Sequence, residues 1–229
     1  MVEIISGRKQ RRNRMSEKVL RGWKRVRIKE IGKVITGTTP SKNNPEHWGN
    51  EILFITPSDY KDYNKWSHNS ERKLSVIGKE KLRKKLLPPK SVMVTCIGSD
   101  MGKVAITPFP VITNQQINSI IVDEKKAYYN FIYYFLKDRS EELKLLGHSG
   151  GSALPILNKS TFENLEITIP ESLDEQRAIA GVLSSLDDKI DLLHRQNKTL
   201  EAMAETLFRK WFIEEAKEDW EYNTRPLHK

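Results

Sequence analysis

Four polar loops of this 229-residue sequence carry the side chains that could do chemistry, and that chemistry is hydrogen bonding. The segment 37–44 offers hydroxyls, amides and a lysine, and the run 114–116 offers amides that can meet an adenine edge with two hydrogen bonds. The glycine-rich segment 147–152 could bring backbone amides to a phosphate, and the segment 60–66 interleaves aromatic rings with lysines. An ordinary, internally hydrogen-bonded turn is the alternative for each loop.

Catalytic machinery is missing from the same sequence. It contains neither a phosphate-binding loop of the G-x-x-x-x-G-K-[ST] type nor a strand followed by G-x-G-x-x-G. Its one Pro-Pro pair, Pro88-Pro89, is typical of a helix stop and lacks the context of a base-holding methyltransferase loop. The five histidines lack metal-ligand spacing, and 123–126 is interpreted as a charged turn. We therefore predict a non-catalytic chain with no cofactor or metal of its own; an intrinsic endonuclease is the distant alternative.

Charge indicates the class of partner. The 39 Lys and Arg residues against 30 Asp and Glu give a net charge of +9, which favours a polyanion such as nucleic acid, although a well-solvated basic surface would also account for it. The single cysteine, Cys96, lies in an apolar run and excludes a disulfide framework. Without a long apolar stretch or a signal-peptide core, we expect a cytoplasmic protein with no membrane association.

Candidate contacts to double-stranded DNA follow from the loop chemistry and the charge together. They are chosen by side-chain type and loop position, and they are Thr38, Ser41, Lys42, Asn43, Lys61, Lys65, Ser99, Lys103, Asn114, Gln115, Ser149 and Ser152.

The chain divides into four predicted regions. Residues 1–20 form a basic arm without apolar periodicity, expected to be disordered, and 217–229 form a short tail. Residues 21–171 form a β-rich α+β domain whose two helices are expected at 79–87 and 129–146. Its strands are expected at 52–56, 91–97, 104–107, 116–122 and 165–169.

Residues 172–216 are predicted to form one long helix. Ser172 and Glu175 have the spacing of a capping box, and the following apolar residues step alternately by four and three, which is the 3.5-residue repeat of a coiled coil. At 1.5 Å per residue the helix is roughly 60 Å long, so we expect a partner helix to cover it; folding back on its own domain is the alternative. The predicted dimerisation stripe, with one polar position near its middle, is Ile179, Leu183, Leu186, Ile190, Leu193, Asn197, Leu200, Ala204, Leu207 and Trp211.

Taken in order, short motifs from about Trp23 to Ile213 resemble the specificity subunit of type I restriction–modification enzymes. No single piece is specific, but the ordered set is. The pieces are Gly22-Trp23-Lys24 with Ile28-Lys29-Glu30-Ile31, Thr36 to Ser41, His47-Trp48-Gly49 with Ile52 to Pro57 and Asp59, Leu87-Pro88, Ile97-Gly98-Ser99 to Gly102-Lys103, Asn114 to Asn118, Gly151-Ser152, and Ile167 to Pro170 leading to Glu175-Gln176-Arg177-Ala178-Ile179-Ala180.

The resemblance implies a DNA target-recognition domain and a helix that docks methyltransferase and restriction subunits. S-adenosylmethionine, ATP and Mg²⁺ would be carried by those subunits. The family pattern has two recognition domains and two antiparallel helices, whereas this sequence holds one of each, with a faint echo of a second start at 219–227. A half-length subunit that forms a homodimer and reads a split site would rebuild the pattern. The alternative is a half-subunit that binds and modulates the methyltransferase without productive DNA reading.

Overall fold

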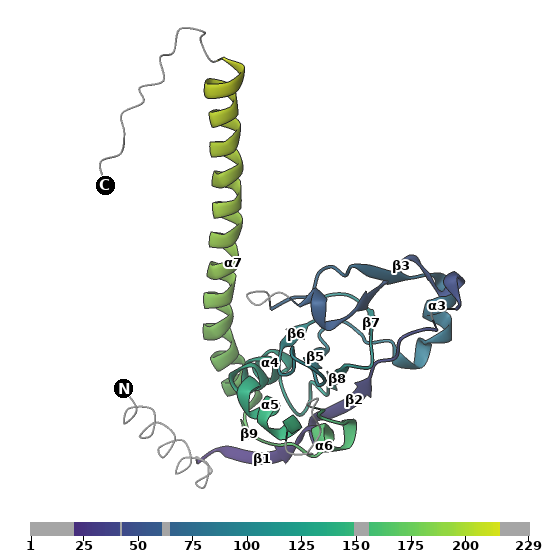
Figure 1. The fold of residues 1–229 in the computed structure, drawn as a ribbon. Helices are drawn as coiled ribbons and strands as arrows, with labels where there is room; N and C mark the ends of the chain where they lie inside the picture. The colour runs from purple at the N-terminus through teal and green to yellow at the C-terminus, as the bar shows by residue number, and fades with distance from the viewer. Residues whose placement is uncertain (1–20, 42, 61–64, 149–155, 216–229) are drawn as a thin grey trace. The chain divides into compact units, whose positions relative to one another are not determined.

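The computed structural model describes residues 21–41, 43–60, 65–148 and 156–215 (Figure 1). The predicted arm 1–20, the tail 217–229 and the echo at 219–227 lie outside these residues. The chain separates into two compact units, with the boundary between Asp187 and Asp188. The first unit is a mixture of short strands and helices, and the described part of the second, up to residue 215, continues one long helix, so the predicted α+β class is confirmed.

The largest sheet has four strands that pair in the order β2-β8-β5-β6, each antiparallel to its neighbour. Its register places Thr36 opposite Asn118 and Thr95 opposite Ile117. Because neighbours run in opposite directions, the chain leaves β2 and β5 and enters β8 and β6 at one edge of the sheet. The strands are β2 (Gly32–Thr36), β5 (Val92–Thr95), β6 (Val104–Ile106) and β8 (Ile117–Val122).

Two smaller sheets complete the β structure. One pairs β1 (Trp23–Arg27) with β9 (Glu166–Pro170) in antiparallel fashion. The other has the order β4-β3-β7, in which β3 is antiparallel to β4 and parallel to β7. Its strands are β3 (Trp48–Ile55), β4 (Arg72–Leu74) and β7 (Val111–Thr113).

Short helices connect and cover the sheets. The α-helices of the first unit before its last element are α2 (Ile28–Ile31), α3 (Val76–Lys81), α4 (Tyr129–Asp138), α5 (Ser140–His148) and α6 (Lys159–Glu163). The 3₁₀ turns are η1 (Pro45–His47), η2 (Pro57–Asp59) and η3 (Arg83–Lys85).

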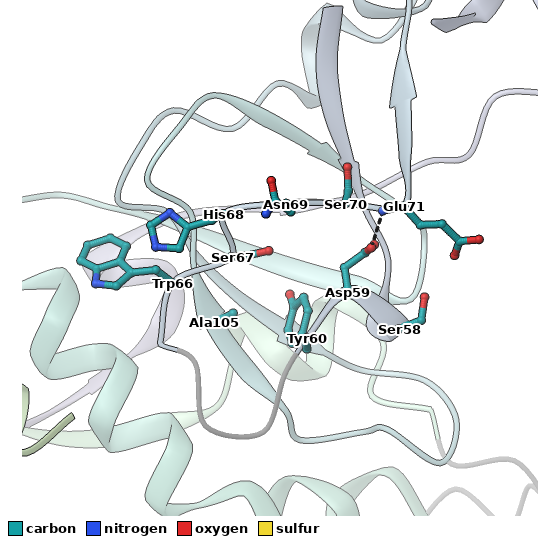
Figure 2. Close-up of a pocket in the computed structure, with 10 residues that line it drawn as sticks. All are labelled: Ser58, Asp59, Tyr60, Trp66, Ser67, His68, Asn69, Ser70, Glu71 and Ala105. Carbon is teal, nitrogen blue, oxygen red and sulfur yellow. Dashed lines mark hydrogen bonds between the residues drawn. The ribbon is translucent and has the colours of Figure 1, made fainter. Parts of the chain in front are cut away.

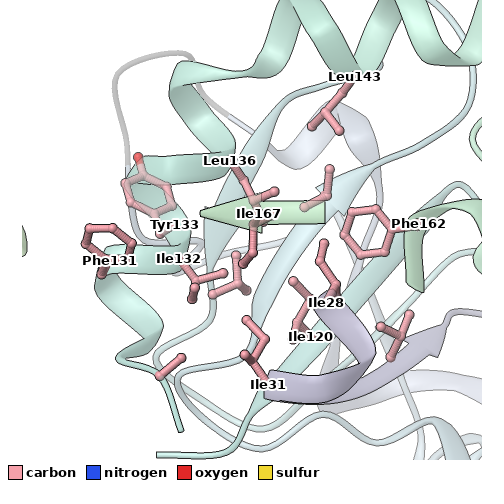
Figure 3. Packing of buried hydrophobic residues seen from close by; sticks show 14 of the residues in the cluster. Ile28, Ile31, Ile120, Phe131, Ile132, Tyr133, Leu136, Leu143, Phe162 and Ile167 are labelled. Atoms are coloured by element: carbon pink, nitrogen blue, oxygen red, sulfur yellow. The ribbon is translucent and has the colours of Figure 1, made fainter. Parts of the chain in front are cut away.

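The main core lies between α4, α5, α2, α6 and one face of the large sheet. Figure 3 shows Ile132 and Leu136 of α4 pointing toward Ile28, Ile120 and Ile167, and all five side chains are buried. Each such side chain contributes roughly 1.5–3 kcal/mol by leaving water. This packing holds the sheet rigid and so fixes the positions of the loops at its edge.

The thiol of Cys96 lies in the same core, as the apolar run around it predicts. It is 2 % exposed, and burial raises its pKa from 9.0 to about 12. The charged thiolate is therefore suppressed at neutral pH, and Cys96 is a packing residue.

Several boundaries differ from the sequence-based expectation. The helix predicted over 129–146 is two helices, because the chain turns at Arg139, where α4 ends and the amide donates to Leu136 O. The helix predicted over 79–87 is α3 followed by the tighter turn η3. Strands β1, β2, β4 and β7 were not predicted. They are at most five residues long, and their pairing partners are distant in sequence.

The long helix α7 spans Leu173–Arg209 and is followed by a π-helical turn, η4 (Lys210–Glu214). Ser172 Oγ accepts a hydrogen bond from Glu175 N at 3.4 Å, which is one half of the predicted capping box. Glu175 Oε1 instead accepts from Trp23 Nε1 at 3.2 Å. The predicted long helix is confirmed from Leu173 to Glu214, and its last turn is π-helical, which changes the residue spacing at Trp211.

Candidate nucleic-acid interface

Three polar loops meet at the edge of the large sheet where β2 and β5 end and β8 and β6 begin (Figure 1). One follows β2, one joins β5 to β6, and one joins β7 to β8. The structure thus places the loop segment of Thr38 against the turn of Asn114 and Gln115, with the loop of Ser99 and Lys103 next to that turn. The predicted contacts Ser41 and Asn43 lie further along the loop after β2.

The loop after β2 is held tightly against the turn between β7 and β8. Thr38 N donates to Thr113 O at 2.9 Å, and Thr39 Oγ1 donates to Gln115 Oε1 at 2.6 Å. A Cβ atom on Gly37 would overlap the carbonyl oxygens of Thr113 and Asn114. Glycine is therefore required at position 37 for the two backbones to approach this closely.

The two amides of this turn have different surroundings. Asn114 is 7 % exposed, and its side chain donates to Gln116 Oε1 at 2.8 Å and accepts from Gln116 N at 3.1 Å. Its hydrogen bonds close the turn, which is the alternative that the sequence left open for this run. Gln115 is exposed, and its Nε2 donates to no other described residue. Gln115 therefore has the amide that is available to a base edge.

The loop between β5 and β6 is shaped by two glycines with positive φ, Gly98 and Gly102, both at +88°. Thr95 Oγ1 accepts from Lys103 N at 2.9 Å and fixes the base of the loop. Ser99 is exposed at its tip, and Lys103 Nζ lies 3.0 Å from Asp100 Oδ1. A phosphate would have to compete with Asp100 for Lys103.

One predicted contact lies away from this edge. Lys65 is 6 % exposed, and its Nζ donates to Ser184 Oγ at 3.2 Å while lying 5.4 Å from the centre of the Trp66 ring and 5.8 Å from that of Tyr134. Lys65 is thus packed against aromatic rings, so we leave it out of the proposed DNA surface.

Four other predicted contacts, Lys42, Lys61, Ser149 and Ser152, lie outside the described residues. The chain re-enters the structure after 149–155 at Ile156, which bridges to Ile97 in the loop between β5 and β6.

A basic segment that the sequence analysis treated only as a helix borders the same edge. It is formed by α3 and η3, and Lys85 Nζ donates to Thr36 O at 3.0 Å, where β2 ends. Lys79 and Arg83 pair with Glu51 and Glu80. The exposed Lys81 and Lys84 make no ion pair with another described residue. The cation run of 79–85 was the available signal, and only the fold places it beside the loops.

A separate pocket of about 340 Å³ lies between η2, the segment 66–71 and Ala105 (Figure 2). The hydroxyls of Tyr60 and Ser67 are buried there without a hydrogen-bond partner among the described residues, and Asp59 Oδ1 accepts from Glu71 N at 2.7 Å. Among the described residues, no lysine or arginine lines the pocket. It is large and polar enough for water molecules to satisfy both hydroxyls.

The predicted dimerisation stripe has two parts. Ile179 packs against the main core and Leu183 is half-buried, so their own domain covers them. The following members of the stripe are exposed, with Leu193 and Leu200 at 45 % and 61 %. The exposed part consists of Leu186, Ile190, Leu193, Asn197, Leu200, Ala204, Leu207 and Trp211.

Two features of the described residues bear on other functions. No helix in them is both long enough and apolar enough to cross a membrane. No group of three or more His, Cys, Asp or Glu side chains in this part of the chain is arranged to hold a metal ion.

Comparisons with known proteins agree with the resemblance found in the motifs. The family model described as "Type I restriction modification DNA specificity domain" matches residues 21–202. The chain is 35 % identical over 198 residues to the type I restriction enzyme MjaIX specificity subunit of Methanocaldococcus jannaschii, covering 86 % of this chain and 45 % of that one. It is 41 % identical over 154 residues to the HindI specificity subunit of Haemophilus influenzae, covering 66 % and 33 %.

Solved structures share the fold. The S subunit of a type I restriction–modification system from M. genitalium matches with a TM-score of 0.61 and 20 % identity, covering 83 % of this chain and 46 % of that one. The HsdS subunit from Thermoanaerobacter tengcongensis matches with a TM-score of 0.55 and 18 % identity, covering 78 % and 41 %. The chain spans less than half the length of these relatives. It belongs to the type I restriction–modification DNA specificity family, which agrees with the prediction of a non-catalytic chain that recognises DNA.

Proposed function

We propose that this chain recognises one half of a bipartite DNA target and directs the methyltransferase and restriction subunits of a type I system to that target. The observation that carries the proposal is the convergence of three polar loops on one sheet edge beside a basic segment. Hydroxyls and amides on a rigid edge suit base reading, and neighbouring lysines suit phosphate binding.

We assign the proposed roles, DNA reading and pairing, to two of the predicted regions. Residues 21–171 read the half-site, and 172–216 act as spacer and pairing helix. At the sheet edge, the exposed Gln115 and Ser99 and the half-buried Thr38 have the chemistry for base or backbone contacts. Each good base contact would contribute about 1–3 kcal/mol of discrimination. Lys81 and Lys84 would add affinity that is independent of sequence and sensitive to salt.

A homodimer would present two such edges. The exposed part of the apolar stripe on α7 supports pairing with a second copy, and Asn197 near its centre would disfavour shifted or higher-order pairings. Antiparallel pairing would give a twofold axis and hence a target made of two half-sites related by that axis.

Partner subunits would supply the catalytic activities, methylation and restriction. The helix α7 also carries an apolar surface that includes Ala202, Met203 and Leu207, the last of which belongs to the stripe as well, and beside it Thr199 and Thr206 donate their hydroxyls to Arg195 O and Ala202 O. This face supports docking of a methyltransferase subunit, which would bring S-adenosylmethionine. A restriction subunit would bring ATP and Mg²⁺.

The proposal is tested by mapping methylation. The chain is purified with its cognate methyltransferase subunit and S-adenosylmethionine, and methylated positions are mapped in DNA of random sequence. We expect methylation confined to a split site with symmetric halves. Methylation without a defined sequence would overturn base reading by this chain and would favour the alternative, a half-subunit that only modulates the methyltransferase.

The basic segment formed by α3 and η3 leads to a separate prediction about the salt dependence of DNA binding. Replacing Lys81 and Lys84 with glutamine should weaken DNA binding at low salt and lower the slope of log K against log salt concentration by about one for each phosphate that the variant no longer neutralises. Discrimination between target and non-target DNA should not change, because phosphate contacts carry no sequence information. The measurement is fluorescence anisotropy over a salt series.

The matched control is Lys125→Gln. Lys125 is exposed in the turn after β8, at the edge of the sheet opposite the loops, so its loss should leave the salt slope as it is. If the slope of log K against log salt concentration were equal for wild type and the double variant, α3 and η3 would not be part of the interface.

A further inference from the structure

We propose that the first turns of α7, Leu173–Asp187, form a fixed joint with the recognition domain, and that Gln176 is the positioning residue that sets the direction in which the helix leaves it. This inference rests on the proposed function for its consequence, the separation of the two half-sites. Its physical content, a rigid joint, concerns the isolated chain alone.

Gln176 is the centre of the joint. Its side chain is 0 % exposed and lies one turn from the buried Ala180, on the face of the helix that packs against the domain. Oε1 accepts from Tyr128 N at 2.8 Å, and Nε2 donates to Pro170 O at 2.8 Å. One side-chain amide thereby pairs a part-buried donor before α4 and a buried acceptor at the end of β9. Either backbone group left unpaired would cost about 1–3 kcal/mol, so this helix orientation is strongly preferred over a shifted one.

A second point of attachment lies two turns further along. Ser184 Oγ accepts from Asn130 Nδ2 at 2.8 Å and from Lys65 Nζ at 3.2 Å. Tyr134 OH donates to Asp187 Oδ2 at 2.8 Å. Eight residues separate Gln176 from Ser184, which is roughly 12 Å along the axis. Attachment at two points this far apart fixes a direction, which a single point cannot do.

Apolar packing fills the space between the two attachments. Ala180 is 0 % exposed, and Ile179 packs against the main core. The burial ends abruptly, because Asp191 is the one described side chain from 188 to 215 that is not exposed. The same helix therefore begins as part of the recognition domain and continues with almost all of its side chains in solvent.

A small change of tilt at the joint would produce a large displacement at the far end of the helix. From Asp188 to Arg209 the helix extends roughly 33 Å, so a tilt of about 10° at the joint would move its far end by roughly 6 Å. Successive base pairs are about 3.4 Å apart, so this displacement approaches two base pairs. A loosened joint should therefore change the permitted gap between half-sites and leave the half-site bases unchanged.

The joint is tested in the full-length chain by pulsed electron paramagnetic resonance. Spin labels are placed at Lys125→Cys in the domain and Lys189→Cys on the helix, both exposed positions, and the labelled chain is diluted with unlabelled chain to remove contacts between copies. We expect one narrow distance distribution in the parent chain. Gln176→Leu, which keeps the bulk and removes both hydrogen bonds, should at least double its width.

Two further variants keep the test decisive. Ser184→Ala removes the hydrogen bonds from Asn130 and Lys65 at the second attachment, with little effect on packing, and should broaden the distribution even if Gln176→Leu folds poorly. Gln196→Leu changes the same residue type at an exposed position of the same helix and should leave the distribution narrow. Narrow distributions in both joint variants would overturn the proposal.

The functional consequence is read with the methyltransferase on DNA carrying two half-sites at gaps that differ by one base pair. Gln176→Leu should methylate at least two more gap lengths than wild type, with the same half-site bases. An unchanged gap preference in a variant with a broadened distribution would overturn the link to spacing. Absence of sequence-defined methylation by wild type would instead overturn the proposed function and leave the resonance result standing.

Discussion

Replacing both Leu193 and Leu200 with aspartate is expected to convert a dimer of this chain into a monomer of 26.6 kDa. Both side chains are exposed on the apolar stripe of α7, and a symmetric pair would bury four of them. Each buried leucine contributes about 1.5–3 kcal/mol, and a buried carboxylate opposes association further, so the dissociation constant should rise by more than about a hundredfold. Sedimentation equilibrium measures the change.

The control for this pair is Leu192→Asp. Leu192 is 39 % exposed on the same helix but lies off the 3.5-residue stripe, so the substitution should leave the mass of the dimer unchanged. The circular dichroism of all variants should match, because these positions do not support the recognition domain. A double variant that sediments with the mass of the parent dimer would contradict the assigned pairing face.

The second large effect is expected when a single methyl group is added at position 37 by the substitution Gly37→Ala. In Gly37→Ala the added Cβ would overlap two backbone oxygens of the turn 113–116, so the loop after β2 must move away from Gln115. We expect the free energy of unfolding to fall by about 1–3 kcal/mol. Sequence-specific DNA affinity should fall at least about tenfold, the equivalent of removing one base contact.

Gly181→Ala provides a matched comparison. Position 181 is exposed in α7, and a Cβ there would meet nothing within 4 Å, so alanine should stabilise the helix by about 0.5–1 kcal/mol. Urea unfolding and binding to the mapped target, measured on both variants, separate the two effects. An unfolding free energy of Gly37→Ala equal to that of wild type would contradict the close approach of the two loops.

Much of the fold could be predicted because its signals are local. The 3.5-residue repeat of Leu186, Leu193 and Leu200 identifies the long helix without any knowledge of its surroundings. The apolar run around Cys96 likewise predicts a buried strand. The short strands β1, β4 and β7 escaped prediction because segments of three to five residues become strands only when a distant partner pairs with them.

The residue types that make up the candidate site could be predicted, but which of the predicted residues belong to it could not. Polar loop residues such as Gln115 and Ser99 could be proposed from type and position alone. The burial of Lys65 against Trp66 and Tyr134, and the closed hydrogen bonds of Asn114, could not, because both depend on groups that the sequence does not place. The basic segment was overlooked for the same reason, since only the contact from Lys85 to Thr36 places it beside the loops.

What the sequence determined by itself is the long helix with its apolar stripe, the basic charge, the polar loops and the family. All of these are properties of residue type and near-neighbour spacing, which the chain carries whether or not it is folded. Tertiary structure alone decided which loops share an edge and how far the domain covers the helix. Antiparallel pairing brings β2, β5 and β8 together, and Gln176 bonds to groups 48 and 6 residues away. Such contacts arise from packing in three dimensions, which spacing along the chain does not encode.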